Sequence, residues 1–527
     1  MTNDFQRDRM MDRLRDETFD VLVVGGGATG LGVAVDAATR GYRTALIEAE
    51  DFAKGTSSRS TKLVHGGVRY LEQMDISLVT EALRERGLLY RNAPHIVRDL
   101  AFIVPRYKWW EGPFYGAGLK AYDLLAGKLN IAPSRSLSAK ETIAEIPNVE
   151  TRDLKGGVRY FDGQFDDARL AISLARTAAD HGAAIANRCR AVSFLKDRGQ
   201  CAGVVVRDLA GEDEFEIRAA AVVNACGIFA DELRRIDEPE APAVIEPAQG
   251  VHLVLDRKFQ PSDTAIMVPH TDDGRVLFVI PWHHRVVVGT TDTPMPNPEI
   301  EPRALPDEID FILRNANRYL ADDPSASDVK AVFAGQRPLV HPGGTGGSTK
   351  SISRNHEVFV SSSGVVTIVG GKWTTYRKMA EDTMSRVIAV GGLADRRCVT
   401  ESLKVHGSLD RNDPALPKHD PHRMYGSDAV EVAAIAEADP ALESTLHPEL
   451  PYSGAEFVYA ARSEMAVGLE DAMARRTRCL LLDAEASAEI APKVATLLAA
   501  ELGRDQAWID REVRAFRDLA DGYRYHA

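Results

Sequence analysis

The stretch VLVVGGGATGLG, residues 21–32, decides the fold of this 527-residue chain. It opens with an apolar run, turns through consecutive glycines and continues into the helical pattern LGVAVDAATRG, residues 31–41. A second apolar run, TALIE, ends at Glu48. Strand, turn, helix and strand in this order predict a βαβ unit, the beginning of a parallel sheet with helices packed against it.

The glycines of this turn follow the G-x-G-x-x-G pattern of dinucleotide-binding proteins. Gly25 permits a tight turn, Gly27 lets the backbone approach a pyrophosphate, and Gly30 lets the helix and strand pack closely. Glu48 follows Gly30 by 18 residues, at a strand end, where a carboxylate can accept both ribose hydroxyls of an adenosine. This context favours a bound dinucleotide over a glycine-rich turn that binds nothing.

The residues after Glu48 bear on which dinucleotide is bound. The segment KGTSSRSTKLVHGGVRY, residues 54–70, brings several hydroxyl groups together, and these could line a cofactor that stays bound. A later strand ends at Gly370 and Gly371, and Thr374 or Thr375 can cap a new helix there. The N-terminus of that helix would stabilise negative charge on a reduced flavin. These features point to FAD.

Composition narrows the class of protein. The net charge of −13 argues against nucleic acid as the main partner. Five cysteines without C-x-x-C spacing indicate reduced thiols in a cytoplasmic protein, and the adjacent His283 and His284 lack a third ligand, so we expect no metal site. The N-terminus is too charged for a signal peptide, and no run of 18 apolar residues predicts a membrane span.

Strand-like runs recur along the chain and indicate a discontinuous domain. We assign residues 19–90, 151–245 and 351–392 to an FAD-binding domain. Residues 91–150 and 246–350 form a substrate-binding and interface region, whose runs GVHLVL, RVLFVIPW and HRVVVGTTD predict antiparallel sheet. The mostly helical pattern of the remainder predicts a C-terminal helical domain, residues 393–527.

Motifs over nearly the whole chain resemble one family. They are GGGATGLG, GTSSRSTKLVHGGVRYLEQ, YFDGQFDDARL, NACGIFAD, GTTDTP, AGQRPLV, ISRNHEV, GGKWTTYRKMAE and EFVYAARSEMAVGLEDAMARRTR. The chain is similar to the FAD-dependent, quinone-linked glycerol-3-phosphate dehydrogenases, within the D-amino-acid-oxidase-like flavoproteins. That α/β fold has a Rossmann-like FAD-binding domain, an antiparallel-sheet substrate domain and a helical C-terminal cap, which agrees with the segmentation. Cys226 departs from the family's usual threonine; because the position is expected to offer backbone, we expect little effect.

The resemblance implies that sn-glycerol 3-phosphate is oxidised to dihydroxyacetone phosphate. Hydride leaves C2 for flavin N5 while a base takes the C2 hydroxyl proton, so FAD is the implied cofactor. The expected cofactor-binding residues are Gly25, Gly27, Gly30, Glu48, Ser57, Ser58, Ser60, Thr61, Leu63, Ala225, Gly227, Gly371, Lys372 and Thr374.

A phosphate group needs several cations in one pocket. The candidates are Arg69, Arg337, Arg354 and Lys372, with the hydroxyl of Tyr70 beside them. Each cation flanks a glycine turn, a strand end or a proline, where a side chain can reach a cleft; the alternative for each is a solvated surface charge. Arg337 is also a candidate catalytic residue.

Two histidines, His65 and His252, compete as the base, and Asp292 is a candidate for orienting one of them. His65 precedes Gly66 and Gly67, which we expect to let the backbone pass close to the flavin ring. A satisfied structural histidine is the alternative for either position.

The electrons must then leave the cofactor. The family's usual acceptor is a membrane quinone, and the nearest alternative is an oxidase that uses O2 and releases H2O2. The insertion PRYKWWEGPFYGAGLKAYDLLAGKLN, residues 105–130, combines Trp109, Trp110 and Phe114 with lysines, which suits a bilayer interface. Packing between domains is the alternative for these aromatics. We expect a cytoplasmic protein held peripherally on the inner face of the cell membrane; a homodimer and a flavin-bound sensor without turnover stay open.

Overall fold

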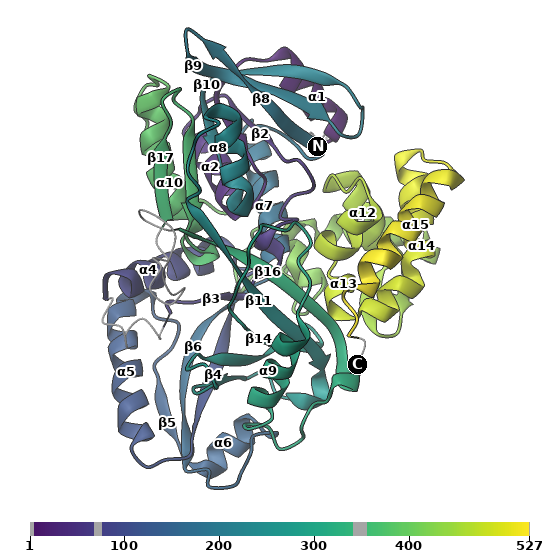
Figure 1. Ribbon diagram of the computed structural model, residues 1–527. Helices are drawn as coiled ribbons and strands as arrows, with labels where there is room; N and C mark the ends of the chain where they lie inside the picture. Colours follow the sequence, from purple (N-terminus) through teal and green to yellow (C-terminus); the bar gives the residue numbers. More distant parts are fainter. Residues whose placement is uncertain (1–4, 68–75, 341–355, 526–527) are drawn as a thin grey trace.

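Two large β-sheets and a group of C-terminal helices with a short hairpin build the protein, as a computed structural model shows for residues 5–67, 76–340 and 356–525. The first sheet lies at the top of Figure 1, the second below it, and the C-terminal helices, in yellow, lie to one side. This arrangement confirms the predicted fold class. The domain boundaries given above stay a prediction.

The first sheet is parallel at its centre. Strand β1 (Phe19–Val24) pairs with β2 (Thr44–Ile47) on one side and with β10 (Glu214–Asn224) on the other. Beyond them lie β7 (Ala184–Ala186), next to β2, and β18 (Val366–Gly370), next to β10. Segments far apart in sequence thus bring their carboxyl ends to one edge, where ligands bind in open α/β sheets.

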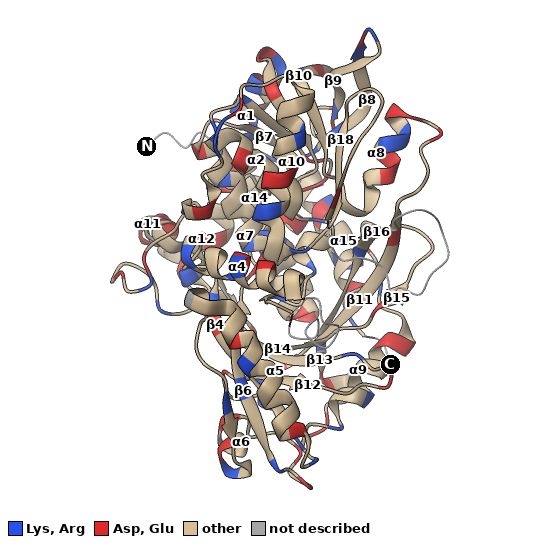
Figure 2. Cartoon of the chain, turned by 90° about the vertical axis from the view of Figure 1, so that its left-hand side faces the viewer, with Lys and Arg blue, Asp and Glu red and all other residues tan. Residues whose placement is uncertain are grey.

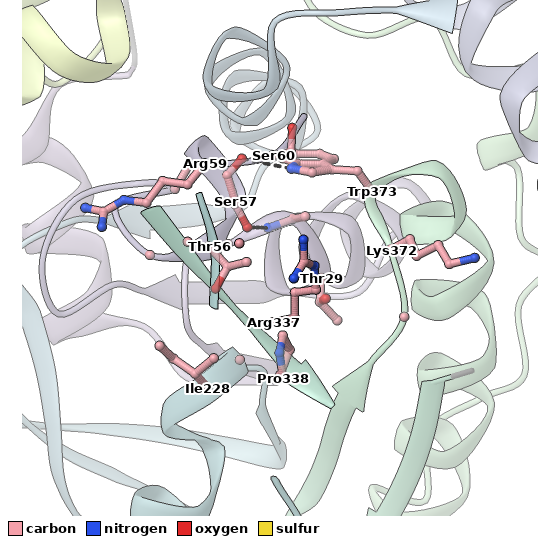
Figure 3. A pocket seen from close by; sticks show the side chains of 18 of the residues that line it. Thr29, Thr56, Ser57, Arg59, Ser60, Ile228, Arg337, Pro338, Lys372 and Trp373 are labelled. Atoms are coloured by element: carbon pink, nitrogen blue, oxygen red, sulfur yellow. Dashed lines mark hydrogen bonds between the residues drawn. The ribbon is translucent and has the colours of Figure 1, made fainter. Parts of the chain in front are cut away.

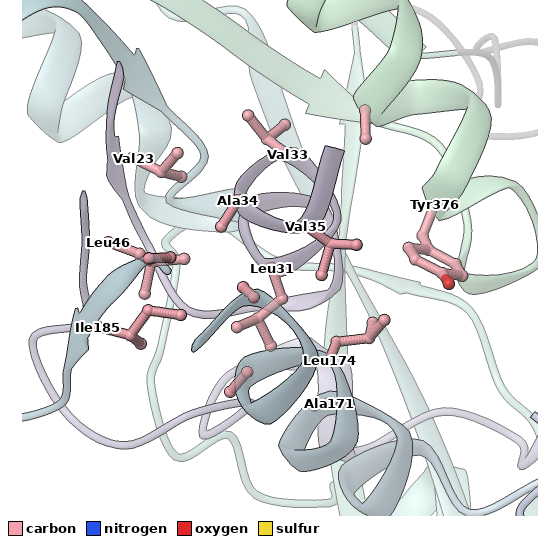
Figure 4. Packing of buried hydrophobic residues seen from close by; sticks show 14 of the residues in the cluster. Val23, Leu31, Val33, Ala34, Val35, Leu46, Ala171, Leu174, Ile185 and Tyr376 are labelled. Atoms are coloured by element: carbon pink, nitrogen blue, oxygen red, sulfur yellow. The ribbon is translucent and has the colours of Figure 1, made fainter. Parts of the chain in front are cut away.

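Helices cover one face of this sheet. They are α2 (Ala28–Thr39), α7 (Asp167–Asp180) and α10 (Tyr376–Val390), and Figure 4 shows their apolar side chains packed against those of the strands. Leu31 and Val33 of α2 are completely buried. A helix that is apolar on nearly all sides, as α2 is, is stable only when other elements surround it.

Shorter elements complete the first sheet. Helix α1 (Arg7–Asp16) packs on the face opposite α2. The hairpin β8 (Cys189–Asp197) and β9 (Gln200–Asp208) leads into β10 by antiparallel pairing. Strand β17 (His356–Val360) lies on the outer edge beside β18, and helix α8 (Ala230–Asp237) follows β10.

The second sheet is mainly antiparallel. Its longest pair is β11 (Ile245–Asp256) with β16 (Val329–Val340), whereas β4 (Arg98–Arg106) and β12 (Ala265–Val268) run parallel. The other described strands are β3 (Leu63–Val64), β5 (Arg135–Leu137), β6 (Gly156–Gln164), β13 (Leu277–Trp282), β14 (Arg285–Gly289) and β15 (Thr293–Pro294). Helices near this sheet are α4 (Ile76–Asn92), α5 (Glu111–Ala126), α6 (Ala139–Glu145) and α9 (Pro306–Ala316).

The α5 region lies on the surface, and Figure 2 shows few charged residues along this helix. The side chains of Trp109 and Phe114 are 82% and 52% exposed, whereas Tyr115 is buried and hydrogen-bonds His270 at 3.1 Å. Packing between domains is therefore the wrong reading for Trp109 and Phe114. Among the helices that the structure describes, none is both long and apolar enough to cross a membrane.

The C-terminal helices form their own apolar cluster. Buried ion pairs join them to the first sheet: Arg476 donates two hydrogen bonds to Asp51 at 2.6 and 2.8 Å, and Arg475 also contacts Asp51. These contacts hold the pKa of the Asp51 carboxyl far below its usual range although burial, the largest single effect, acts in the opposite direction. The helices are α11 (Ala429–Ala438), α12 (Gly454–Ser463), α13 (Cys479–Leu482), α14 (Ala484–Leu502) and α15 (Gln506–Asp521), beside the hairpin β19 (Thr445–His447) and β20 (Leu450–Ser453).

A second link between these regions passes through a histidine. The two ring nitrogens of His406 lie 2.6 Å from Asp180, at the end of α7, and 2.9 Å from Asp428, just before α11. Burial disfavours the charged imidazole, but the hydrogen bonds to the two carboxylates outweigh burial and raise the pKa of His406 to about 9. His406 is therefore a cation in the folded protein at neutral pH.

Candidate active site

A cavity of about 780 Å³ lies where the carboxyl edge of the first sheet meets the β11–β16 pair. Its size is within the range of cofactor and substrate pockets. Most of the predicted site residues that the structure describes line it: Gly25, Gly27, Glu48, Ser57, Ser60, Thr61, Leu63, His65, Ala225, Gly227, His252, Arg337, Gly371, Lys372 and Thr374.

The glycine turn forms one end of the cavity. Its backbone packs so closely that residues larger than glycine would not fit at Gly25 or Gly30. Gly25 has φ +114°, and a Cβ there would lie 2.5 Å from the carbonyl oxygen of Ala225. Gly30 lies beneath the cavity wall, where a Cβ would lie 1.9 Å from the carbonyl oxygen of Gly25. The turn therefore keeps the first turn of α2 against β1 and β10, with the helix N-terminus at the cavity.

Glu48 is held in place by backbone groups. One carboxylate oxygen accepts a hydrogen bond from Gly26 N at 2.6 Å, and the other accepts one from Glu50 N at 2.8 Å. Each carboxylate oxygen can accept more than one bond, so both can also accept from a ribose hydroxyl. Glu48 therefore lies on the cavity wall with both oxygens held by backbone groups, and its binding of an adenosine ribose stays a prediction.

The hydroxyl-rich segment is only partly on the cavity wall. The Ser57 hydroxyl accepts from Ala28 N at 2.9 Å, and the indole of Trp373 donates to the Ser57 carbonyl at 2.8 Å (Figure 3). Ser58 does not line the cavity; it is buried behind the wall, and its carbonyl accepts from the ammonium group of Lys62 at 2.7 Å. The structure thus brings three of the four predicted hydroxyl residues to the cavity.

The two glycines after His65 have different surroundings. Gly67, with φ +73°, lines the cavity as expected. Gly66 does not, since a Cβ there would lie 2.5 Å from Leu83 and 2.6 Å from the Tyr122 hydroxyl. The expectation that both glycines face the flavin is therefore wrong for Gly66, which is small because it packs against α4 and α5.

Thr374 joins two cavity segments instead of capping a helix. Its hydroxyl oxygen lies 3.3 Å from His65 N and 3.4 Å from His65 O, at the limit of hydrogen bonding. Helix α10 begins after Thr375, whose side chain makes no capping hydrogen bond. Thr375 thus occupies the predicted N-cap position of α10 without a capping hydrogen bond, and Thr374 instead contacts the backbone of a candidate base.

His252 is buried in β11, with its side chain only 2% exposed. Its Nε2 lies 2.9 Å from the Thr61 hydroxyl, and its ring stacks on Phe333 of β16 with 4.8 Å between centroids. Burial, followed by the positive charges of Lys62 and Arg337, holds the pKa of His252 well below its usual range. The imidazole is therefore uncharged at neutral pH, and the same effects make it a weaker base than a free histidine.

Arg337 reaches the cavity because the opposite strand has no side chain in its path. Gly250 pairs with Gly335, and a Cβ on Gly250 would lie 2.4 Å from the Arg337 guanidinium. Arg337 donates to Asp292 at 3.0 Å and to the Thr290 hydroxyl at 3.2 Å. A guanidinium fixed in this way presents its remaining edge in a defined direction.

Asp292 pairs with two arginines of the described residues, whereas the sequence predicted that it would orient a histidine. Its carboxylate forms ion pairs with the guanidinium groups of Arg337 and Arg275. Arg275 lines the cavity and was not predicted from the sequence. In the sequence DGRVLF, Arg275 stands at a glycine turn before a strand, as the predicted cations do, so this pattern could have indicated it as a cavity residue.

Of the other predicted phosphate-binding residues, only Lys372 belongs to the described part of the chain. Lys372 lines the cavity, but Figure 3 shows its amino group directed away from Arg337. Arg69, Tyr70 and Arg354 lie outside the described residues. Within the described part of the chain, no group of three or more His, Cys, Asp or Glu side chains could hold a metal ion.

Comparisons with known proteins agree with this geometry. The FAD dependent oxidoreductase family matches residues 20–377, and the C-terminal domain of alpha-glycerophosphate oxidase matches residues 366–509. The probable mitochondrial glycerol-3-phosphate dehydrogenase of Caenorhabditis elegans is 41% identical, over 97% of this chain and 74% of the relative's length. The human mitochondrial glycerol-3-phosphate dehydrogenase is 40% identical, over 96% of this chain and 73% of the relative's length. The chain belongs to the FAD-dependent glycerol-3-phosphate dehydrogenase family.

A solved structure from the same family supports the whole arrangement. The glycerol-3-phosphate dehydrogenase of Bacillus halodurans, complexed with FAD, matches with a TM-score of 0.80 and 30% identity, over 98% of this chain and 97% of its own. FAD is accordingly the cofactor of the family member described here. The glycine turn that a Cβ would fill, the adjacent helix N-terminus and the carboxylate of Glu48 are the groups that an FAD needs at its pyrophosphate and ribose.

Proposed function

We propose that this protein oxidises sn-glycerol 3-phosphate to dihydroxyacetone phosphate and passes the electrons to a membrane quinone. The observation that carries the proposal is the placement of Arg337 and His252 on one wall of the FAD cavity, on adjacent strands. One is a fixed cation, and the other is a neutral imidazole. An oxidation of a phosphorylated alcohol needs both: an anchor for the phosphate and an acceptor for the hydroxyl proton.

FAD supplies the redox chemistry when bound, since its N5 atom accepts the hydride that leaves C2. Gly27, at the start of α2, offers its backbone to the pyrophosphate, and Glu48 accepts from the adenosine ribose. The other cofactor contacts predicted from the sequence are proposed for the residues on the cavity wall. Ser58 is left out because its carbonyl points to Lys62.

Arg337 binds the substrate phosphate in this proposal. Its guanidinium is oriented by Asp292 and by the Thr290 hydroxyl, so little side-chain entropy is lost when the phosphate binds. We propose the same phosphate-binding role for Arg69, Tyr70, Arg354 and Lys372. For these four residues the proposal rests on their sequence motifs and on the family resemblance.

His252 is the preferred base. Its low pKa keeps the ring unprotonated, and Nε2 shares a hydrogen bond with the Thr61 hydroxyl, which also lines the cavity. The proton of the C2 hydroxyl can reach Nε2 directly or through Thr61, while C2 loses its hydride and becomes the ketone carbon. His65, whose backbone contacts Thr374, is the alternative base.

The acceptor is proposed from the surface of α5. Phe114 on α5 and Trp109 in the turn just before it are exposed, with Trp110 and Lys108 beside Trp109, and the helix carries few charges. Exposed aromatics next to lysines suit the interface of an anionic bilayer, which is where a quinone is reached. This surface supports a protein held on the cytoplasmic face of the cell membrane.

An anaerobic titration tests the reaction. Glycerol 3-phosphate should bleach the flavin absorbance of the purified protein, and dihydroxyacetone phosphate should form in equal amount; an unchanged spectrum would exclude the reaction. Re-oxidation then separates the acceptors, because a quinone analogue should restore the flavin faster than air. Rapid re-oxidation by air with one H2O2 per turnover would make the protein a glycerol-3-phosphate oxidase.

A further inference from the structure

Arg275 lies close to the candidate phosphate site but outside the predicted set. It ends a tight turn before β13, where its backbone N–H donates to the Thr271 hydroxyl at 3.0 Å and to Asp273 at 3.1 Å. Its guanidinium forms an ion pair with the Asp292 carboxylate at 2.6 Å and donates a hydrogen bond to the Asp292 carbonyl oxygen at 3.2 Å. The side chain is only 12% exposed. The turn and the double contact therefore fix Arg275 against Asp292.

Asp292 is shared between two arginines. One carboxylate oxygen faces Arg275 at 2.6 Å, and the other faces Arg337 at 3.0 Å. The three side chains come from three segments, namely the turn before β13, the residues after β14 and strand β16. A bridge of this kind couples the position of each guanidinium to that of the other.

The charges of the three groups do not cancel. If Arg337 were the one arginine beside Asp292, the carboxylate would neutralise its positive charge, and the pair would attract a phosphate only weakly. With Arg275 added, the two guanidinium groups and one carboxylate keep a net charge of +1. Asp273 also lies 3.4 Å from Arg275, but its side chain is 36% exposed, so water screens it more than Asp292, which is 6% exposed.

We propose that Arg275 is a positioning residue that, through Asp292, orients Arg337 in the cavity and keeps the trio cationic toward the substrate's phosphate. The proposal rests on the function proposed above and deepens it. A purely structural residue that only tethers the turn to Asp292 would give the same contacts, so the test has to change charge and packing separately.

The test compares Arg275→Gln, Arg275→Lys and the double variant Arg275→Gln/Asp292→Asn in the FAD-loaded protein. The first readout is the Kd of inorganic phosphate, followed through the absorbance of the oxidised flavin. The second is the split between KM and kcat for glycerol 3-phosphate. FAD content and melting temperature are measured for each variant.

We expect Arg275→Gln to raise the phosphate Kd and the KM about tenfold, the scale of one partly screened charge near a dianion. Arg275→Lys, which keeps the charge, should change them about threefold or less. The double variant restores the charge of +1 but removes the carboxylate that orients Arg337, so it should recover part, and not all, of the lost affinity. A double variant no better than Arg275→Gln, an Arg275→Lys as weak as Arg275→Gln, or loss of FAD from Arg275→Gln would overturn the proposal.

The phosphate titration involves no turnover, so it separates this proposal from the proposed function. If glycerol 3-phosphate fails to reduce the wild-type flavin, the reaction is wrong, whereas the phosphate Kd values still report whether Arg275 supports an anion site. If the wild type is reduced normally and Arg275→Gln binds phosphate as the wild type does, only the role of Arg275 is wrong.

Discussion

Replacement of Gly30 by alanine should weaken FAD binding without unfolding the protein. The added Cβ would lie 1.9 Å from the carbonyl oxygen of Gly25 and 3.3 Å from the Cβ of Ala225. The first of these neighbours is backbone and cannot rotate away. The start of α2 would have to move from the turn by about 1 Å to reach an allowed contact distance.

The cost follows from this geometry. Forcing an extra methyl group into a packed site costs about 1–3 kcal/mol. Without FAD, α2 can shift and relieve the clash, whereas FAD requires the backbone of the turn and the helix N-terminus in their present positions. The clash therefore makes the free energy of FAD binding less favourable by about 1–3 kcal/mol, and the Kd for FAD should rise about 5- to 150-fold.

The assay uses apoprotein titrated with FAD, together with the FAD content of the protein as purified. Acid precipitation should release the flavin of the wild type into the supernatant, since no covalent bond is expected. Gly116→Ala is the matched control, because Gly116 is also helical and its Cβ would meet nothing within 4 Å. Wild-type FAD affinity in Gly30→Ala would refute the role given to this glycine.

Three further predictions concern the base, stability and the surface. His252→Asn should retain FAD and slow anaerobic flavin reduction about 10²- to 10⁴-fold; a loss below threefold would favour the other candidate histidine. Because the pKa of His406 in the folded protein is about 9, its charged form stabilises the fold by about 2–3 kcal/mol below pH 6.5, and this stabilisation is lost as the pH rises through 9. The difference in melting temperature between the wild type and His406→Asn should therefore vanish over that pH range. A difference that does not depend on pH would contradict this prediction. The double variant Trp109→Ser/Phe114→Ser should weaken co-sedimentation with anionic liposomes and leave dye-coupled turnover unchanged. The control Val430→Ser changes an exposed residue (68%) outside α5 and should sediment as the wild type does. Unchanged sedimentation of the double variant would contradict the membrane role.

The sequence predicted the parts of the site that depend on neighbouring residues. The glycine turn and Glu48 belong to a single βαβ unit, whose geometry is determined by local spacing. Ser58 and Gly66 are different, because their neighbours come from distant segments: the Ser58 carbonyl accepts from Arg478, and the Gly66 N–H donates to the Tyr122 hydroxyl. Whether a residue in such a segment faces the cavity depends on which distant element packs behind it.

The phosphate site shows the same limit over longer distances. Arg337 and Asp292 are 45 residues apart in sequence, and Arg275 precedes Asp292 by 17. Their contact follows from the pairing order of β11, β13, β14 and β16, which hydrophobic periodicity does not specify. The motif around Arg337 could therefore be recognised, while the carboxylate that holds it was assigned to a histidine.

The buried pairing of Asp51 with Arg475 and Arg476 has a consequence for biosynthesis. Asp51 lies four residues after the end of β2, yet its partners are 424 and 425 residues later in the chain. Removing the cations from a buried carboxylate costs about 3–5 kcal/mol, so this pairing ties the C-terminal region firmly to the start of the first sheet. The ribosome makes Asp51 early and its two arginine partners almost last. We therefore expect the segment after β2 to reach its final packing only when nearly the entire polypeptide has been synthesised.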